Sequence, residues 1–591
     1  MRWATLVVAV LCLVVLFPGL GRPGFVDHRE ARDAAVAREI LQRREFLTPL
    51  YGGDAHFEKP FIAYLPEMLA QHLTPGSPLG PRAVKALLAV GLVLVTASIG
   101  AQHFGARAGA CAGGVLATTL GLTLAVRSDG TQLLCTLLGW VGCSGLADAL
   151  FGRQRGRELR LVVTYAALAA TLVAGGLLPA LWPLGGLALY LRLSRMHDGW
   201  RRVRPLPGFA LMIGLALPWY GAMIERHGAE FIARMPFFPY GVEARGPWYA
   251  GPLIALAFLV VGAFPWSTLL PGALSHAATW WRFARRTPRH VAPAKRSTND
   301  ARTAAESPRR DPLVPGGADT DRPASDPLAR ELREETAAHF FIAALGAALI
   351  PLVLYPGPPL PAALPALPAV ALLCGRFLDH LFEDPRRVAE PLTTAIRMLA
   401  LAGTVAAILL VLLSPRLRDA EHELRLLGAS LLLASWAPLL AQLLGRTRIA
   451  GALLALPVAI GAPLVGLRLL PALEDYLNSA SAAAAFDGIA PPRAPLLLIE
   501  PAPPSLRLGL DRNLVVAPAL AEALAKFPAS DGRTYLAFRP AREREVARTA
   551  RTPLEILLRT PSLVLARVEP RLEQPHLQGL GSSFGVDPAR P

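Results

Sequence analysis

Stretches of about 20 consecutive apolar residues recur along this chain and constrain its fold more than any other feature. A helix of ~20 such residues crosses the ~30 Å hydrocarbon core of a bilayer and satisfies its backbone polar groups internally. We therefore predict about thirteen transmembrane helices, which form an all-α polytopic membrane bundle. The predicted spans cover residues 4–20, 84–102, 108–126, 131–150, 161–178, 180–194, 207–224, 252–273, 339–355, 360–378, 395–413, 427–444 and 449–470.

The composition agrees with a lipid environment. Of the 591 residues, 53% are hydrophobic and 18% are charged, too few charges to cover a soluble protein of this length. The net charge is +16, and Arg residues gather in short segments between apolar runs, as at 151–160 and 192–205. Such segments stay on the cytoplasmic side, so we expect a cytoplasmic N-terminus and an external C-terminus. Because the basic residues flank membrane helices, we predict no nucleic-acid partner.

Breaks in the apolar pattern divide the chain into four regions. Residues 1–274 form an N-terminal transmembrane module with a large first external loop at 21–83, and residues 338–470 supply the remaining spans. Residues 275–337 are rich in Pro, Ser, Asp and Arg, which predicts a disordered cytoplasmic linker. Residues 471–591 predict a small external α/β domain, with strands at 496–500, 535–539 and 563–568 and a helix at 519–527.

The cysteines and histidines show no metal-ligand pattern. All five cysteines lie inside apolar runs, and no two have a spacing such as CxxC. The histidines show no HxxxH spacing. We expect buried thiols, and we predict neither a disulfide framework nor a dedicated metal site.

The first external loop opens with a segment that predicts an amphipathic helix. Its apolar stripe can be formed by Ala31, Ala34, Ala35, Ala37, Ile40 and Leu41, with charges on the other face, so it can lie in the interface plane. Asp27 and Glu30 stand at its N-terminal end, where the helix dipole favours negative charge. Two interpretations stay open here: the two acids cap the helix, or they supply carboxylates for chemistry.

The second element of this loop places Glu58 and Lys59 side by side before Pro60. A carboxylate can take the proton of an attacking hydroxyl, and an ammonium can stabilise charge on a departing phosphate. The alternative is an ordinary exposed charged loop.

In the loop before the fourth predicted span, Arg127 and Asp129 lie close to the membrane plane, where charges are often functional. The alternative is a solvated turn.

Several short motifs occur here in a characteristic order: E-x-R, A-x-A-R-E, T-P and F-E-K-P. In this order they resemble the bacterial undecaprenyl-phosphate-aminoarabinose (lipid A) transferases and their protein O-mannosyltransferase relatives, of the GT-C superfamily. The matching residues are Glu30-Ala31-Arg32, Ala37-Arg38-Glu39-Ile40, Thr48-Pro49, Gly53, Phe57-Glu58-Lys59-Pro60, Arg82, Pro218-Trp219-Tyr220, Pro247-Trp248-Tyr249 and Phe264-Pro265-Trp266.

The resemblance implies a retained first helix and an inverting transfer of a hexosyl or pentosyl group from a polyprenyl-phosphate carrier. The acceptor would be a lipid, a glycan or a protein at the periplasmic face of a bacterial inner membrane, and a divalent cation takes part in some members. It implies that an acidic residue of the first loop binds or deprotonates the acceptor and that Lys59 lies near the lipid phosphate. Together with the patterns above, this leads us to expect catalytic roles for Asp27, Glu30 and Glu58 and substrate binding by Arg32, Lys59, Arg82, Arg127 and Asp129.

The chain departs from the family pattern at the acidic centre. In an ungapped match Arg29 occupies the position of the catalytic aspartate, so Asp27 and Glu30 are both carried as candidates. Such departures leave a non-catalytic or repurposed GT-C relative open, as well as a transporter of lipid-linked sugars. A transporter is expected to show internal repeats and charged sites at the membrane midplane. The predicted spans are nearly free of central charges, which favours chemistry at the external face.

Overall fold

The chain forms two compact units in the computed structural model. The first, here the membrane unit, comprises Met1–Gly24 and Arg32–Leu473, and the second, the C-terminal unit, comprises Phe25–Ala31 and Glu474–Pro591. The structure describes residues 2–26, 29–128, 130–152, 156–196, 198–234, 250–277, 327–354, 364–491, 496–499, 503–510, 514–516, 534–550 and 554–568.

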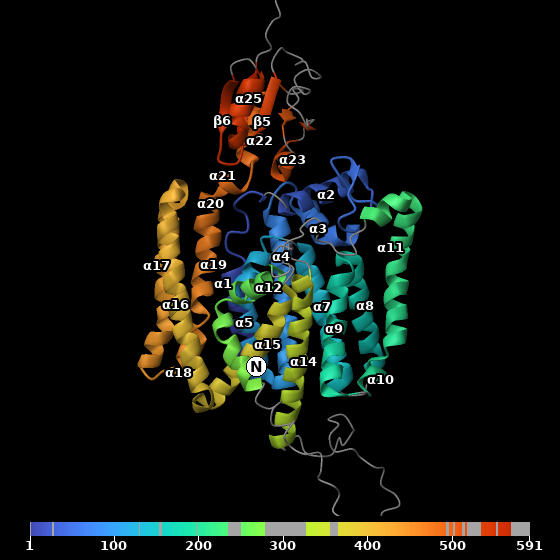
Figure 1. Ribbon diagram of the computed structural model, residues 1–591, viewed down its shortest axis with the longest axis vertical. Helices are drawn as coiled ribbons and strands as arrows, with labels where there is room; N and C mark the ends of the chain where they lie inside the picture. Colours follow the sequence, from blue (N-terminus) through green and yellow to red (C-terminus); the bar gives the residue numbers. More distant parts are fainter. Residues whose placement is uncertain are drawn as a thin grey trace, which may run out of the picture. The chain divides into compact units, whose positions relative to one another are not determined.

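The membrane unit is built almost entirely of helices (Figure 1). Its first half contains α1 (Arg2–Leu16), α2 (Arg29–Arg43, whose first residues belong to the C-terminal unit), β1 (Leu50–Tyr51), β2 (Asp54–Ala55), η1 (Phe61–Tyr64), α3 (Leu65–Leu73), α4 (Leu79–Phe104), α5 (Ala106–Ala117), α6 (Leu120–Ala125), α7 (Gly130–Phe151), α8 (Arg157–Gly175), α9 (Leu177–Ser194), α10 (Gly199–Val203) and α11 (Pro205–Arg234). Its second half contains α12 (Ala250–Gly262), η2 (Trp266–Thr268), α14 (Pro327–Leu354), α15 (Leu367–Glu383), η4 (Pro385–Val388), α16 (Ala389–Leu413), η5 (Ser414–Arg416), η6 (Arg418–Ala420), α17 (Glu421–Leu443), α18 (Thr447–Leu453), α19 (Leu456–Leu464), η7 (Val465–Leu469) and α20 (Leu470–Ala472).

Among the residues that the structure describes, nine helices are long and apolar enough to cross a membrane. Two further apolar helices are shorter, over Thr5–Leu16 and Gly251–Gly262. The polytopic helical bundle is therefore present, whereas the predicted count of thirteen spans is not confirmed. The first predicted span, 4–20, ends early because α1 stops at Leu16, just before Pro18 and Gly19.

The predicted span 108–126 is wrong as one helix, because it divides into α5 and α6. The break falls at Thr118 and Thr119, whose hydroxyls donate to the carbonyls of the preceding turn. The backbone N–H of Leu120 then donates to the carbonyl of Phe264 (2.9 Å), and the indole of Trp266 donates to Thr118 Oγ1 (3.0 Å). Tertiary hydrogen bonds thus satisfy the interrupted helix.

The predicted linker also ends earlier than expected. Residues 278–326 lie outside the described residues, but α14 already begins at Pro327, within the segment 275–337 that was predicted as linker. The buried carboxylate of Glu335 on α14 pairs with Arg376 on α15 at 2.6 Å. This ion pair fixes the charged first turns of α14 against the bundle.

Small residues set the packing at the centre of the membrane unit. Helix α15 is buried along nearly its whole length and packs on α4 and α5. Gly100 on α4 faces Gly109 on α5 so closely that a Cβ on Gly109 would lie 2.4 Å from backbone atoms of α4. Glycine allows this approach because it has no Cβ, as is common between membrane helices.

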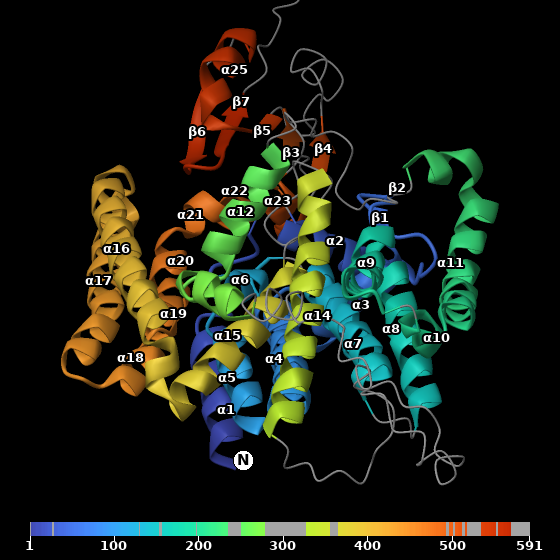
Figure 2. The ribbon, with the colours of Figure 1, turned by 60° about the horizontal axis from the view of Figure 1, so that its bottom comes forward.

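The two ends of the α7–α9 bundle differ in what covers them. Segments η1 and α3 lie at the end where α7 begins and α8 finishes, whereas α10 packs on α7 at the opposite end (Figure 1). At one edge of the unit, α16 and α17 run side by side (Figures 1 and 2). The short α10 therefore marks the end of the bundle that is remote from α3.

The C-terminal unit contains a five-stranded mixed sheet in the order β4-β3-β5-β7-β6. Its elements are α21 (Glu474–Leu477), α22 (Ala480–Ile489), β3 (Leu496–Leu498), α23 (Pro504–Gly509), β4 (Leu514–Val516), β5 (Thr534–Phe538), η8 (Pro540–Arg542), α25 (Glu543–Ala550), β6 (Leu554–Arg559) and β7 (Val564–Val568). Strands β3, β4 and β5 are parallel, and β7 is antiparallel to both β5 and β6. Alternate residues of β3 pack with α22 and with α25, on opposite faces of the sheet.

Three of these strands coincide with the predicted runs at 496–500, 535–539 and 563–568. Strands β4 and β6 were not predicted. The helix predicted at 519–527 lies outside the described residues. The bounds of the predicted external domain stay a prediction.

We predict that Gly109→Ala destabilises the protein, whereas Gly214→Ala on α11 does not. The added Cβ at Gly109 meets backbone of α4, which cannot move like a side chain, so we expect a loss of about 1–3 kcal/mol or more. No atom lies within 4 Å of a Cβ at Gly214, and alanine favours a helix over glycine by up to about 1 kcal/mol. Thermal unfolding in detergent measures both variants, and equal effects would contradict this packing.

Candidate active site

A tight hairpin places the F-E-K-P segment beside α2. Strands β1 and β2 are joined by Gly52 and Gly53, which both have positive φ (67° and 93°), a turn that glycine makes without steric cost. The carboxylate of Glu39 on α2 accepts hydrogen bonds from both glycine N–H groups, at 2.9 and 3.0 Å. The chain that leaves the hairpin is thereby held along α2.

Two adjacent ion pairs join this chain to α2. Arg32 Nη2 lies 2.8 Å from both carboxylate oxygens of Glu58. Lys59 Nζ donates to Asp33 Oδ2 at 2.8 Å, and these two side chains are only 6% and 3% exposed. A charge buried this deeply needs an opposite charge, so the Asp33–Lys59 pair fixes the position of the loop. We call these four side chains the charge cluster.

The carboxylate of Glu58 is held in its ionised form. Its Oε2 lies 3.3 Å from His56 Nε2. Burial alone would raise the pKa of Glu58, but the hydrogen bond with His56 and the charges of Arg32 and Lys59 outweigh burial, and the pKa falls to about 2. At neutral pH Glu58 is therefore a stable anion and a weak base.

The aromatic ring of Tyr64 closes the buried side of the charge cluster. Lys59 Nζ lies 6.0 Å from the centre of this ring, the outer limit of a cation–π contact. The side chain of Tyr64 is fully buried. Burial, together with the negative charge of Asp33, raises the pKa of Tyr64 well above 10, so its hydroxyl stays protonated.

A further buried ion pair lies where α3 meets α4. Lys85 Nζ is 3.7 Å from Glu67 Oε1, and it donates to the backbone carbonyl of Ser128 at 3.1 Å. Both charged side chains are almost completely buried. This contact ties α3 and α4 to the chain just before α7.

Arg82 and Arg127 hold the chain that follows α1. The buried guanidinium of Arg82 donates to the carbonyls of Leu20 (3.1 Å), Pro23 (2.8 Å) and Gly24 (2.9 Å). Arg127 donates to the carbonyl of Pro18. These bonds position the start of the first loop, and the predicted role of both arginines in substrate binding stays a prediction.

Three acidic candidates remain untested by this geometry. Asp27 and Asp129 lie outside the described residues. Glu30, in the C-terminal unit, is buried, and its Oε2 accepts the backbone N–H of Val26 at 3.1 Å. That bond agrees with the capping interpretation, and a catalytic role for Glu30 stays a prediction.

The first loop is also attached to α11. Glu45 accepts two hydrogen bonds from Arg226, at 2.9 and 3.1 Å. The hydroxyl of Thr48 lies 2.7 Å from His227 Nε2, and the ring of Phe57 packs edge-on against the same histidine. Helix α11 therefore supports the loop on the side away from α2.

Sequence reasoning missed Asp33, Tyr64, Glu67 and Lys85. Asp33 lies on the buried face of α2 with Val36, Ala37 and Ile40. An acidic residue within an apolar stripe is the sequence feature that could have indicated its buried ion pair. The second signal was the rarity of lysine. Only four of the 60 Lys and Arg residues are Lys, and two of them, at 59 and 85, form buried ion pairs.

The described residues contain no group of three or more His, Cys, Asp or Glu side chains that could hold a metal ion. The five cysteines are free thiols, and four of them are buried.

Comparisons with known proteins find similar sequences over about half of the chain. No protein-family model matches the chain. Over 304 residues the chain is 28% identical to the undecaprenyl phosphate-alpha-4-amino-4-deoxy-L-arabinose arabinosyl transferase of Pseudomonas aeruginosa, which covers 48% of this chain and 52% of that relative. Over 300 residues it is 27% identical to a second such transferase, of Pseudomonas fluorescens, with 49% of each chain covered. The chain thus spans about half the length of the curated relatives it matches.

Solved structures extend the likeness to nearly the whole chain. ArnT from Cupriavidus metallidurans, in the apo state and bound to undecaprenyl phosphate, superposes with TM-scores of 0.70 and 0.71. The sequence identity is 18%, and the match covers 96% of this chain and 98% of that chain. The chain has the fold of ArnT. The predicted resemblance to the aminoarabinose transferases is confirmed.

We predict that Glu58→Gln removes a pH-dependent part of the stability. Because the pKa of Glu58 in the folded protein lies below the ordinary 4.5, its stabilisation is complete above about pH 4.5 and disappears as the pH falls towards 2. The melting temperature of the wild type should exceed that of E58Q above pH 4.5, and the difference should shrink in acid. A difference that does not change with pH would contradict the ionised pair.

Proposed function

We propose that this chain is a membrane glycosyltransferase that moves a sugar from a polyprenyl-phosphate carrier to a lipid, glycan or protein acceptor. The reaction would take place at the periplasmic face of a bacterial inner membrane. The sequence likeness to two transferases named for an undecaprenyl-phosphate-linked sugar supports this proposal, as does the fold of ArnT, solved with undecaprenyl phosphate. The observation that carries it is the charge cluster in the first loop.

The two cations of the charge cluster would act on the donor. Arg32 is 26% exposed, whereas Lys59 is 6% exposed, so Arg32 is the cation that an arriving phosphate would meet first. A guanidinium binds phosphate oxygens in a bidentate manner, and Lys59 directly behind it would add positive charge. Both charges would stabilise the polyprenyl phosphate as it leaves.

A single displacement at the anomeric carbon of the sugar would invert its configuration. The acceptor oxygen forms a bond to the anomeric carbon, the bond from that carbon to the phosphate oxygen breaks, and its electron pair leaves with the phosphate. A carboxylate takes the acceptor proton. We assign this proton to Asp27 or Glu30, because Glu58, with a pKa of about 2, is too weak a base and is committed to Arg32 and His56.

The distribution of charge supports a periplasmic site. Described parts of the two Arg-rich segments, 156–160 and 198–205, lie at the α10 end of the bundle, and basic loops stay in the cytoplasm. Segments η1 and α3, which follow the F-E-K-P segment, lie at the opposite end. These two facts support an outward-facing charge cluster.

Turnover by the purified protein tests this function. Protein reconstituted in liposomes is given a polyprenyl-phosphate sugar and a crude lipid acceptor, and free polyprenyl phosphate is measured. We expect release by the wild type and a loss of at least 100-fold in Lys59→Met, because one preorganised charge contributes about 10²–10³ in rate. Arg234→Gln, which removes an exposed cation from a surface pair on α11, is the matched control and should keep full activity.

The alternatives give different results in the same liposomes. Passage of intact donor across the membrane without release of polyprenyl phosphate would favour the transporter. Absence of both release and passage, with every donor tried, would favour a non-catalytic relative. Normal release by Lys59→Met would contradict the proposed role of Lys59, although the protein would still be a glycosyltransferase.

A further inference from the structure

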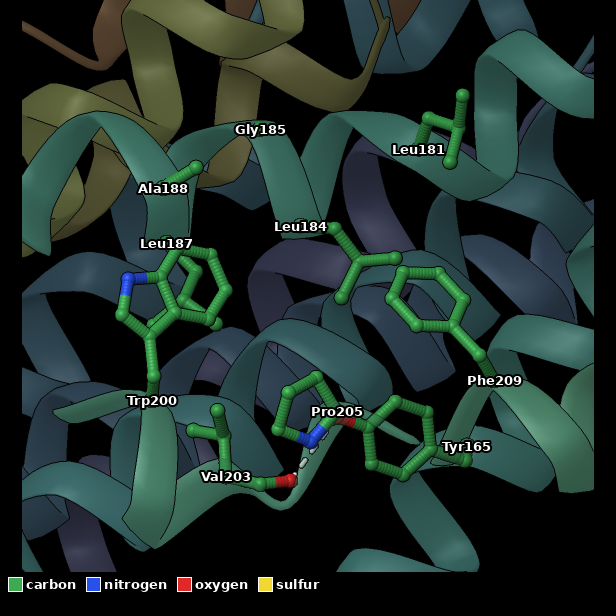
Figure 3. A pocket seen from close by; sticks show the side chains of 10 residues that line it. All are labelled: Tyr165, Leu181, Leu184, Gly185, Leu187, Ala188, Trp200, Val203, Pro205 and Phe209. Atoms are coloured by element: carbon green, nitrogen blue, oxygen red, sulfur yellow. Dashed lines mark hydrogen bonds between the residues drawn. The ribbon is translucent and has the colours of Figure 1, made fainter. Parts of the chain in front are cut away.

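An apolar cavity of about 340 Å³ lies among α8, α9, α10 and α11 (Figure 3). Leu184 and Ala188 form one wall, and Trp200, Tyr165 and Phe209 face them across the space. The hydroxyl of Tyr165 donates to the carbonyl of Val203 at 3.0 Å, so it is used within the wall. A lining of this kind suits a hydrocarbon chain and gives no anchor for a polar molecule.

The part of α9 that lines the cavity is about 10 Å long. Its lining on α9 runs from Leu181 to Ala188, and α9 ends at Ser194. At 1.5 Å per residue, the lining starts about 9 Å from the helix end and reaches about 20 Å from it. Half of the hydrocarbon core measures about 15 Å, so a lipid chain that enters from the α10 end would fill the cavity lengthwise.

Exposed arginines occur in the sequence next to lining residues at this end of the cavity. Arg192 lies on α9, one turn after Ala188, Arg195 follows α9, and Arg201 on α10 follows the exposed Trp200; we call these three arginines the basic rim. The exposed Asp198 lies between Arg195 and Arg201 in the sequence and offsets part of their charge, whereas Glu158 pairs with Arg204. Trp at the interface and clustered Arg beside a helix end are the usual contacts of an anionic headgroup.

We propose that this cavity holds one acyl chain of an anionic phospholipid whose phosphate lies on the arginines of the rim. This site is independent of the glycosyltransferase proposal. It differs from the carrier site, because the charge cluster lies at the opposite end of the bundle, where a polyprenyl phosphate would place its headgroup. The phospholipid would fix α10 and the start of α11 to the bundle.

Lipid retention tests the proposal. The full chain is purified in detergent, incubated with phosphatidylglycerol or with phosphatidylcholine of the same chains, and examined by native mass spectrometry. We expect one retained phosphatidylglycerol and no retained phosphatidylcholine. Ala188→Phe, which fills the cavity, and the triple variant Arg192→Gln, Arg195→Gln, Arg201→Gln should each lower retention at least fivefold. Ala188→Leu is a milder filling variant in case the Phe variant fails to fold.

Matched controls separate this site from general effects. Ala429→Phe adds the same ring to an exposed position of α17, and Arg416→Gln with Arg418→Gln removes exposed cations at the other end of the bundle. All of these should retain phosphatidylglycerol as the wild type does. Equal retention of both lipids, unchanged retention in Ala188→Leu and Ala188→Phe, or displacement of phosphatidylglycerol by polyprenyl phosphate would each overturn the proposal.

Discussion

Pairing of buried charge is the constraint on which the candidate site depends. Asp33 and Lys59 are both almost fully buried, and a charge at such a position needs an opposite charge close by. The neighbouring residues Arg32 and Glu58 make a second pair beside them. The charges alternate in sign on both sides of the contact, with Arg32 and Asp33 on α2 facing Glu58 and Lys59 on the loop. A shift of one residue on either side would therefore bring like charges together. The two pairs therefore fix not only the contact between α2 and the loop but also its register.

The supporting contacts follow from this register. The two-glycine turn, held by Glu39, delivers the chain to α2 at the required position, and Arg82 holds the chain that precedes α2. On the other side, Glu45 and Thr48 attach the loop to α11. The membrane helices thus hold the short polar segment that contains the charge cluster.

Sequence alone predicted the parts of this structure that depend on local composition. Apolar runs located the helices of the bundle, and the motif order indicated the family resemblance. It could not predict the break at Thr118 and Thr119, because a carbonyl at Phe264 stabilises it from a distant part of the chain. Asp33 was missed for the same reason: its partner is 26 residues away, and only the folded hairpin brings the two together. Short strands such as β4 also depend on neighbours and have no pattern of their own.

The two ends of the α7–α9 bundle therefore differ in the balance of their charges. At one end, paired acids and bases present a balanced cluster in which Arg32 and Glu58 remain partly exposed. At the other end, unbalanced arginines and an exposed tryptophan suit a lipid headgroup.

Direct binding of a lipid phosphate tests the central claim most closely. Equilibrium binding of polyprenyl phosphate to the protein in nanodiscs is measured for the wild type and for Arg32→Gln and Lys59→Met. The account predicts that each substitution weakens binding at least tenfold, since each removes a cation next to the phosphate. Unchanged affinity in both variants would contradict a lipid-phosphate site at the charge cluster.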